Sequence, residues 1–383
     1  MIREVRTLKN LCIVLPKMPA ISETFLRAHV DHLSPDRRLL LRHEGRLTRE
    51  DGSLLAPGGV RGLPRRVRNK VNRVFVGKAP RDIAADFFKA NHVDVVLAEY
   101  GQTGSATAAS CRLAGVPLVV HFHGYDASNR IELERHADGY QRMFKSANAI
   151  VVVSKAMQRQ LLSLGAPEEK VRLNCYGTKI DERPASDPAS NPPTLVGVGR
   201  FVEKKAPHLT ILAFAKAAAD RPDARLILAG DGPLWGACVS LVKALSLEHA
   251  VELPGLIDHE RVSVLMQQAR AFVQHSVVAS NGDSEGTPLA VLEAAAAGIP
   301  VISTRHAGIP DVIESGVTGF LVDEFDIDGM ATFMRQVLDD PNQAASVGRE
   351  ARAYISANLS LPQSLERLRT ILNEAAAEGV TSS

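Results

Sequence analysis

Two glutamates in SNGDSEGTPLAVLEAAAAGIPVIST, residues 280–304, have the type and spacing to hold a polar ligand. Glu285 precedes a predicted helix, because Pro288 suits a first turn in which its missing N–H leaves no donor unpaired. Glu293 lies inside that helix, which is otherwise nearly all apolar, and burying an unpaired charge is costly. We predict that both carboxylates bind hydroxyls of one elongated ligand. The alternative is a helix cap and a solvated helix residue.

The backbone at the start of this helix is a second candidate for ligand binding. The N–H groups near Gly286, Thr287 and Leu289, around Pro288, are expected to point into a cleft. A helix N-terminus carries partial positive charge and favours anions. This turn is therefore predicted to meet hydroxyls and phosphate oxygens.

Two cations occur in GVGRFVEKKAPH, residues 197–208. Arg200 and Lys205 follow a predicted strand, at the end of the sheet where α/β folds bind ligands. A planar arginine fork and a lysine point charge can together neutralise a diphosphate without a metal. Solvated surface cations are the alternative, and we interpret Lys204 in that way. No G-x-G-x-x-G is complete here, which argues against a dinucleotide site.

The segment HFHGYD, residues 121–126, places histidines where another predicted strand ends. We favour His123 over His121 as a ligand contact, because it lies further beyond the strand; a core histidine is the alternative. Asp126 either orients a partner or caps the next helix. In the first loop, Ser22 is a candidate helix cap, and no glycine-rich phosphate loop is present. That absence favours an acceptor over a nucleotide in the first half of the chain.

Short apolar runs alternate with helix-length stretches along most of the chain. Continuous apolar character is what strands of a parallel sheet covered on both faces require. The predicted strands are residues 11–15, 93–98, 117–122, 149–154, 194–199, 224–230, 251–255, 271–276, 299–304 and 319–322. The predicted helices include residues 81–91, 102–114, 208–219, 234–245, 260–269 and 288–297, with helical material over 326–377. This rhythm predicts two doubly wound α/β halves, joined by a Pro- and Ser-rich linker at residues 181–193.

Composition fits a two-domain globular protein. The chain has 383 residues, of which 45% are hydrophobic and 23% charged, and its net charge of +2 gives no sign of nucleic-acid binding. The four cysteines have no metal-site spacing and fit a reducing compartment. No apolar run reaches the ~18–20 residues that span a bilayer, and the first one is too short for a signal peptide. We predict a cytoplasmic location.

Two further stretches bear on membranes and metals. The basic segment RGLPRRVRNKVNRVFVGK, residues 61–78, has valines on one helical face with basic side chains beside it. It predicts peripheral contact with an anionic membrane, and a solvated basic helix is the alternative. The string Asp326-Ile327-Asp328 begins a predicted helix and is interpreted as a cap. We predict no metal site.

Together these motifs resemble the glycosyltransferase family 4 enzymes of GT-B fold. The resemblance is carried by GRFVEKK at 199–205, GDGP at 230–233, LPG at 253–255, EGTPLAVLEAAAAGIPVI at 285–302 and AGIPDVIESGVTGFLV at 307–322. HFHGYD and SETF, residues 22–25, are typical of bacterial polysaccharide members. The first loop departs from the family pattern, since many relatives have a glycine-rich loop where this chain has LPKMPAISETF.

The resemblance implies a role for each matched residue. Glu293 resembles the glutamate that binds the donor ribose, and Glu285 the one close to the donor sugar and phosphate. Arg200 and Lys205 look like the pair that stabilises the leaving diphosphate, and His123 like the histidine that reaches the donor sugar. The remaining donor-binding positions are Gly286, Thr287, Pro288, Leu289 and, near the base, Leu256 and Ile257.

The resemblance also implies a domain plan and a reaction. Residues 1–182 would bind the acceptor and residues 194–360 the donor, with a final helix over 361–383 crossing back. The reaction would be retaining transfer of a sugar from a nucleoside-diphosphate sugar, UDP favoured over GDP. The acceptor would be a hydroxyl of a sugar or lipid-linked glycan, in polysaccharide or glycolipid biosynthesis. No cofactor or metal is implied. A GT-B nucleotide-sugar epimerase and a non-catalytic nucleotide-sugar-binding module are alternatives, and an NAD enzyme is disfavoured.

Overall fold

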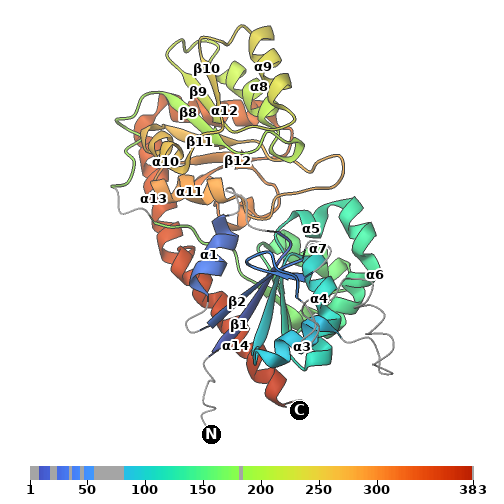
Figure 1. Cartoon of the computed structure of the whole chain (residues 1–383). Helices are drawn as coiled ribbons and strands as arrows, with labels where there is room; N and C mark the ends of the chain where they lie inside the picture. The colour runs from blue at the N-terminus through green and yellow to red at the C-terminus, as the bar shows by residue number, and fades with distance from the viewer. Residues whose placement is uncertain are drawn as a thin grey trace.

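Two sheets, one parallel and one parallel except for an edge strand, are each covered by helices and organise the chain into two lobes (Figure 1). The computed structural model describes residues 8–17, 24–33, 37–43, 47–55, 82–180 and 184–381. Ser22, the basic segment 61–78 and the expected boundary at residue 182 lie outside the described residues.

The first lobe contains a seven-stranded sheet in the order β3-β2-β1-β4-β5-β6-β7. All its pairings are parallel except that of β2 with β3. Its strands are β1 (Asn10–Leu15), β2 (Arg37–His43), β3 (Leu47–Arg49), β4 (Val95–Glu99), β5 (Leu118–His121), β6 (Ala149–Val152) and β7 (Val171–Leu173). Its described helices are α1 (Thr24–His32), α3 (Ile83–Ala90), α4 (Gly101–Ala114), α5 (Tyr125–Ser128), α6 (Arg130–Ser146) and α7 (Lys155–Ser163).

The second lobe contains a six-stranded parallel sheet in the order β10-β9-β8-β11-β12-β13. Its strands are β8 (Thr194–Val198), β9 (Arg225–Ala229), β10 (Val251–Gly255), β11 (Ala271–Gln274), β12 (Val301–Thr304) and β13 (Gly319–Val322). Its helices are α8 (Pro207–Ala217), α9 (Trp235–Ala244), α10 (His259–Gln268), α11 (Leu289–Ala297), α12 (Ile327–Asp339) and α13 (Pro341–Asn358). A short 3₁₀ turn, Glu203–Lys205, precedes α8.

The prediction of a doubly wound α/β fold is confirmed, and each predicted strand is present within a few residues of its expected bounds. The central strands are apolar because both of their faces are covered: residues 11–15 of β1 are all 0% exposed. The strands without a prediction are β2, β3 and β7, at or next to the sheet edge. There, polar residues such as the arginines of β2 replace the continuous apolar signal.

The chain crosses between the lobes twice, and the two crossings pair with each other. Thr178 donates its N–H to the carbonyl of Leu359, and Leu361 donates to the carbonyl of Thr178. From this point α14 (Leu361–Thr381) runs along the first lobe, where Leu368 and Leu372 are buried with residues of β1 and β4 (Figure 1). Among the described residues, no helix is long and apolar enough to cross a membrane.

Candidate functional site

The predicted donor residues of the second lobe lie in the segments that follow β8, β10 and β11. The strand order reverses between β8 and β11, and doubly wound sheets bind ligands at such a switch point. Gly199 and Gly230 allow the loops after β8 and β9 to touch, since a Cβ on Gly230 would lie 1.9 Å from the carbonyl oxygen of Gly199. Arg200, Lys205 and Gln274 line the cleft that forms there.

From this cleft, Lys205 forms an ion pair with Glu285. Lys205 Nζ lies 3.1 Å from Glu285 Oε1, and the two side chains are 15% and 9% exposed. Burial alone would raise the pKa of Glu285, but the charges of Lys205 and then Lys204 outweigh it and lower that pKa to about 2. Glu285 is therefore an ionised hydrogen-bond acceptor beside the Lys205 side chain.

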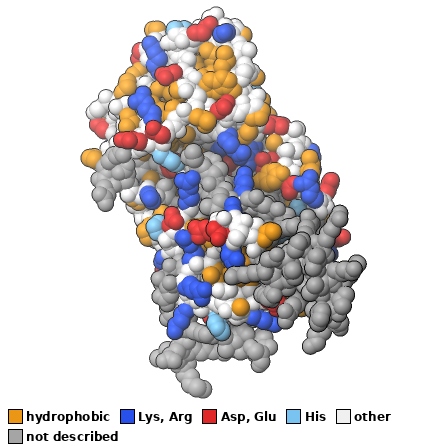
Figure 2. All heavy atoms as spheres, viewed as in Figure 1, with side chains coloured by type: hydrophobic (Ala, Val, Ile, Leu, Met, Phe, Trp, Pro, Cys, Tyr) orange, Lys and Arg blue, Asp and Glu red, His pale blue; other side chains and the backbone are white. Residues whose placement is uncertain are grey.

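Arg200 lines the same cleft as Lys205 but is exposed. Among the described residues, no carboxylate pairs with its guanidinium, so its charge is available to an anionic ligand. On the face shown in Figure 2, Lys and Arg side chains lie at the waist between the two lobes. The two cations that the sequence predicted thus line the same cleft.

The structure corrects our interpretation of Lys204 as a solvated cation. Its side chain is buried, with Nζ 2.9 Å from Asp283 Oδ1 and 3.1 Å from the carbonyl oxygen of Ser284. The preceding Glu203 accepts hydrogen bonds from the N–H and hydroxyl of Ser280. The turn Glu203–Lys205 therefore fixes the loop that carries Glu285 at three successive points.

We expect Lys204→Met to lower the free energy of unfolding by about 3 kcal/mol, because it leaves the Asp283 carboxylate mostly buried without its partner. Urea denaturation measures the change. Lys216→Met is the matched control: its pair with Asp328 is exposed, so its loss should cost about 0.5 kcal/mol or less. Equal losses of unfolding free energy in the two variants would show that the Lys204–Asp283 pair stabilises the protein no more than an exposed pair does.

Glu293 is half-buried on α11. Among the described residues, nothing donates a hydrogen bond to its carboxylate, and burial raises its pKa to about 7. The partner that the sequence analysis required is therefore not supplied by the described protein, which is the condition expected of a carboxylate that awaits a ligand.

The other predicted donor contacts lie around this helix. Pro288 occupies the cap position of α11, directly before Leu289. Thr287 is buried, and its hydroxyl donates to the carbonyl of Val153 in the first lobe at 2.8 Å. After β10, Leu256 is 78% exposed, whereas Ile257 packs against the core. The contacts of these residues with a ligand remain predictions.

The two lobes touch at the loop that begins α11. Ser284 donates its N–H to Ser128 Oγ at 3.0 Å, and a Cβ on Gly286 would lie 2.7 Å from the carbonyl oxygen of His123. Any larger residue at position 286 would push this loop away from the first lobe. His123 therefore reaches the donor loop through its backbone.

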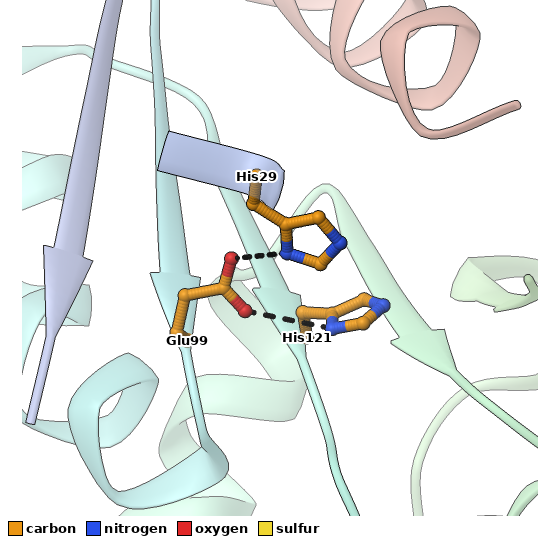
Figure 3. Close-up of side chains that lie close together, drawn as sticks. All are labelled: His29, Glu99 and His121. Atoms are coloured by element: carbon orange, nitrogen blue, oxygen red, sulfur yellow. Dashed lines mark hydrogen bonds and ion pairs between the residues drawn. The ribbon is translucent and has the colours of Figure 1, made fainter. Parts of the chain in front are cut away.

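The His123 ring points instead into a buried cluster around Glu99. Glu99 Oε2 lies 2.8 Å from His123 Nε2, and His123 Nδ1 lies 2.6 Å from the Tyr176 hydroxyl. Glu99 Oε1 lies 2.8 Å from His29 Nδ1, and His121 Nδ1 is 3.5 Å from Oε2 (Figure 3). Both nitrogens of His123 are thus engaged within the protein. Its predicted contact with a donor sugar has no free ring nitrogen to use.

The electrostatics of this cluster are set by burial. Burial, and then His121, lower the pKa of His123 to about 3, so its ring is neutral. Burial acts to raise the pKa of Glu99, but the charge of His29 and hydrogen bonds from the histidines hold it well below its usual value. An ionised carboxylate thus lies among imidazoles at the carboxyl ends of β4 and β5.

His29, Glu99 and His121 place possible metal-ligand atoms within 4.8 Å of one another. Tetrahedral ligands at zinc distances lie about 3.3 Å apart. The 2.8 Å contact between Glu99 and His29 is shorter and has hydrogen-bond length. The geometry favours a hydrogen-bonded cluster over a cation site. The prediction of no metal stays a prediction.

Asp126 fixes the loop between β5 and α5. Its carboxylate accepts hydrogen bonds from the N–H groups of His123, Gly124 and Gly101, so it holds both this loop and the start of α4. At the other end of the chain, Asp326 caps α12 through the N–H of Gly329, as predicted.

Sequence reasoning missed several residues beside the predicted ones, namely His29, Glu99, Tyr176 and Gln274, and also His306, which accepts from the N–H of Glu285, and its partner Glu324. Glu99 carried a usable signal, because it ends an apolar strand at the ligand-binding edge. It is also the register partner of His121. The others, such as His29 on α1 and Gln274 at the end of β11, become neighbours of the site only when the chain folds.

Comparison with known proteins assigns both lobes. Residues 26–177 match the family described as "Glycosyl transferase 4-like domain", and residues 178–354 match "Glycosyl transferases group 1". The "Putative colanic acid biosynthesis glycosyltransferase WcaL" of Escherichia coli K12 is 34% identical over 269 residues, 68% of this chain and 66% of WcaL. The Salmonella typhimurium WcaL aligns over 60% of its length, so this chain spans slightly less than two thirds of these relatives.

Two other similar proteins align with this chain over more of their own length. The "Amylovoran biosynthesis glycosyltransferase AmsK" of Erwinia amylovora is 29% identical over 74% of this chain and 70% of its own. The crystal structure of Anabaena Alr3699/HepE in complex with UDP superposes with a TM-score of 0.70 at 20% identity, over 98% of this chain and 100% of that one. That likeness supports the fold. The chain therefore belongs to the GT-B glycosyltransferases of the family 4, bacterial polysaccharide type.

Proposed function

We propose that this protein transfers a sugar, with retention of anomeric configuration, from a nucleoside-diphosphate sugar to an acceptor hydroxyl in polysaccharide biosynthesis. The observation that carries the proposal is the Lys205–Glu285 ion pair in the segment before α11, near Arg200, which has no carboxylate partner among the described residues. As the bond from the anomeric carbon to the diphosphate breaks, negative charge grows on the leaving phosphate. Two cations and a helix N-terminus already placed there stabilise that charge.

Each part of the donor has a candidate partner. Glu285 accepts from hydroxyls of the sugar, and Glu293 from the ribose. The two cations meet the diphosphate and supply its counter-charge without a metal. UDP is the proposed nucleotide, supported by the likeness of the fold to HepE, which was crystallised with UDP. The acceptor approaches from the first lobe, and the relatives act in colanic acid and amylovoran biosynthesis.

The first experiment is a calorimetric and thermal-shift panel of UDP, GDP, ADP and their common sugars. A nucleotide at about 100 times its Kd should add ~2.7 kcal/mol to the stability of the native state. Incubation of the binding nucleotide sugar with glycan acceptors then tests transfer. Conversion of the donor to an isomer without acceptor would indicate an epimerase, and binding without turnover would indicate a binding module. No binding by any nucleotide would refute the proposal.

Glu293→Gln should have opposite effects on stability and on binding. In the ligand-free protein the pKa of Glu293 is raised to about 7, above the ~4.3 of an unfolded glutamate. The carboxyl therefore favours folding at low pH, and this contribution is lost as pH rises toward and through 7. Glu293→Gln should raise the melting temperature at pH 8, with a smaller gain at pH 5, while nucleotide binding falls.

Glu350→Gln, on the exposed face of α13, is the matched control and should change neither property. If Glu293→Gln lowers the melting temperature at pH 8, or leaves nucleotide affinity unchanged, the carboxylate has a structural role rather than a binding one.

A further inference from the structure

Three hydrogen bonds in series connect the loops after β11, β12 and β13 to the backbone of Glu285. The N–H of Val278 donates to Glu324 Oε2 at 2.9 Å, and Glu324 Oε1 lies 2.6 Å from His306 Nδ1. The N–H of Glu285 donates to His306 Nε2 at 3.1 Å. The side chain of His306 is 1% exposed, so its ring is shielded from water, whereas Glu324 is 26% exposed.

The protons in this series can be assigned from the partners. A backbone N–H can only donate, so His306 Nε2 is an acceptor and carries no proton. The ring proton is therefore on Nδ1, from which it is donated to the Glu324 carboxylate. Both oxygens of Glu324 are in use, and a single neutral tautomer of His306 is fixed from both sides.

The loop that carries Glu285 needs this support because there is empty space beside it. A cavity of about 340 Å³ between the lobes is lined by Glu285, His306 and Glu324 on one side and by Ser128 and Met157 on the other. Loss of the bond to His306 would leave the amide of Glu285 without a partner and give the loop room to move.

We propose that His306 and Glu324 are positioning residues, which hold the backbone of Glu285 so that its carboxylate stays on Lys205. The inference rests on the proposed function in one respect, namely that Glu285 and Lys205 bind the donor. The neighbouring Gly308 supports the same loop, since its N–H donates to the carbonyl of Gly286 at 3.0 Å.

Two substitutions of His306 separate a role in holding the backbone of Glu285 from a role in filling space. A glutamine places its amide oxygen about where Nε2 lies, whereas an asparagine reaches only the position of Nδ1. His306→Gln can therefore still accept from Glu285, and His306→Asn cannot. Glu324→Gln removes one of two acceptor oxygens and should behave like His306→Asn. Asp323→Asn, in an exposed pair with Arg305, is its matched control.

The first readout is hydrogen–deuterium exchange of the ligand-free protein, in peptides that cover residues 282–288. His306→Asn and Glu324→Gln should exchange faster than wild type there, and His306→Gln and Asp323→Asn at the wild-type rate. The second readout is nucleotide release from the donor that the binding panel identifies. A misplacement of about 1 Å can cost about 100-fold in rate, so kcat should fall by about that factor in the first two variants.

The KM for the nucleotide sugar should change by less than about threefold, because the nucleotide contacts are elsewhere, and His306→Gln should keep most of the rate. Unchanged exchange in His306→Asn would overturn the proposal, as would equal loss of kcat in the Gln and Asn variants at matched melting temperatures. If wild type binds no nucleotide sugar, the proposed function fails, while the exchange experiment still decides whether His306 positions Glu285.

Discussion

Lys205→Met should lower kcat for nucleotide-sugar cleavage by about 100–1000-fold, the loss typical when one preorganised group facing a developing negative charge is removed. Methionine keeps most of the side-chain volume, which matters because the lysine stem packs against Gly199. The charge is lost, and of the two cations that line the cleft only Arg200 remains, while Lys204 is committed to Asp283. Nucleotide release at saturating donor measures the effect, and Lys243→Met, exposed on α9, should leave it unchanged.

A structural explanation for such a loss can be separated from a chemical one, because Lys205 also holds Glu285. In a double-mutant cycle with Glu285→Gln, a lysine that acts only through the glutamate would add nothing to the loss already caused by Glu285→Gln. A lysine that acts on the leaving diphosphate should lower kcat further in the double variant. If Lys205→Met has no effect on kcat in the Glu285→Gln background, the proposed role of Lys205 on the leaving diphosphate is contradicted.

The fold was predictable from sequence because parallel strands buried on both faces leave a continuous apolar signal. That signal exists for β1, for β4–β6 and for most strands of the second sheet, whereas the edge strand β10, VELPG, is only partly buried. It fades in β2, where only three leucines lie between arginines, and in the three-residue strands β3 and β7. At a sheet edge, pairing depends on neighbours that a short polar segment does not identify.

The candidate site, like the fold, was predictable from sequence only in part. Glu285 and Lys205 were predictable because each lies in a recognisable loop at a strand's carboxyl end. Lys204 was misinterpreted because adjacent lysines in a 3₁₀ turn point in different directions, and only the position of Asp283 decides which one is buried. His306 and Glu324 escaped notice because loops far from Glu285 in the sequence meet it in space. His123 was predicted from its distance beyond the strand, but Glu99 draws its ring inward.

Glu99→Gln should destabilise the protein by about 3–5 kcal/mol at pH 7, because it removes one charge from a buried, paired group and leaves its partners unmatched. Glu99 is 0% exposed and meets His29 and His123 at 2.8 Å each. An amide offers one acceptor oxygen where the carboxylate offers two, so one of these histidines loses its acceptor. Urea denaturation measures the change. Glu134→Gln, exposed on α6, is the matched control and should shift stability by about 0.5 kcal/mol or less.

The pH dependence distinguishes a charged cluster from a merely well-packed one. The pKa of Glu99 is held well below its usual value in the folded protein, against ~4.3 for an unfolded glutamate. The stability that this carboxylate contributes is therefore present above about pH 4.3 and is lost as pH falls below it. The difference between wild type and Glu99→Gln should be largest near neutral pH and shrink in acid. A difference that stays constant down to pH 3 would mean that shape, rather than the charge of Glu99, holds the histidines and the loop of His123 against the donor site.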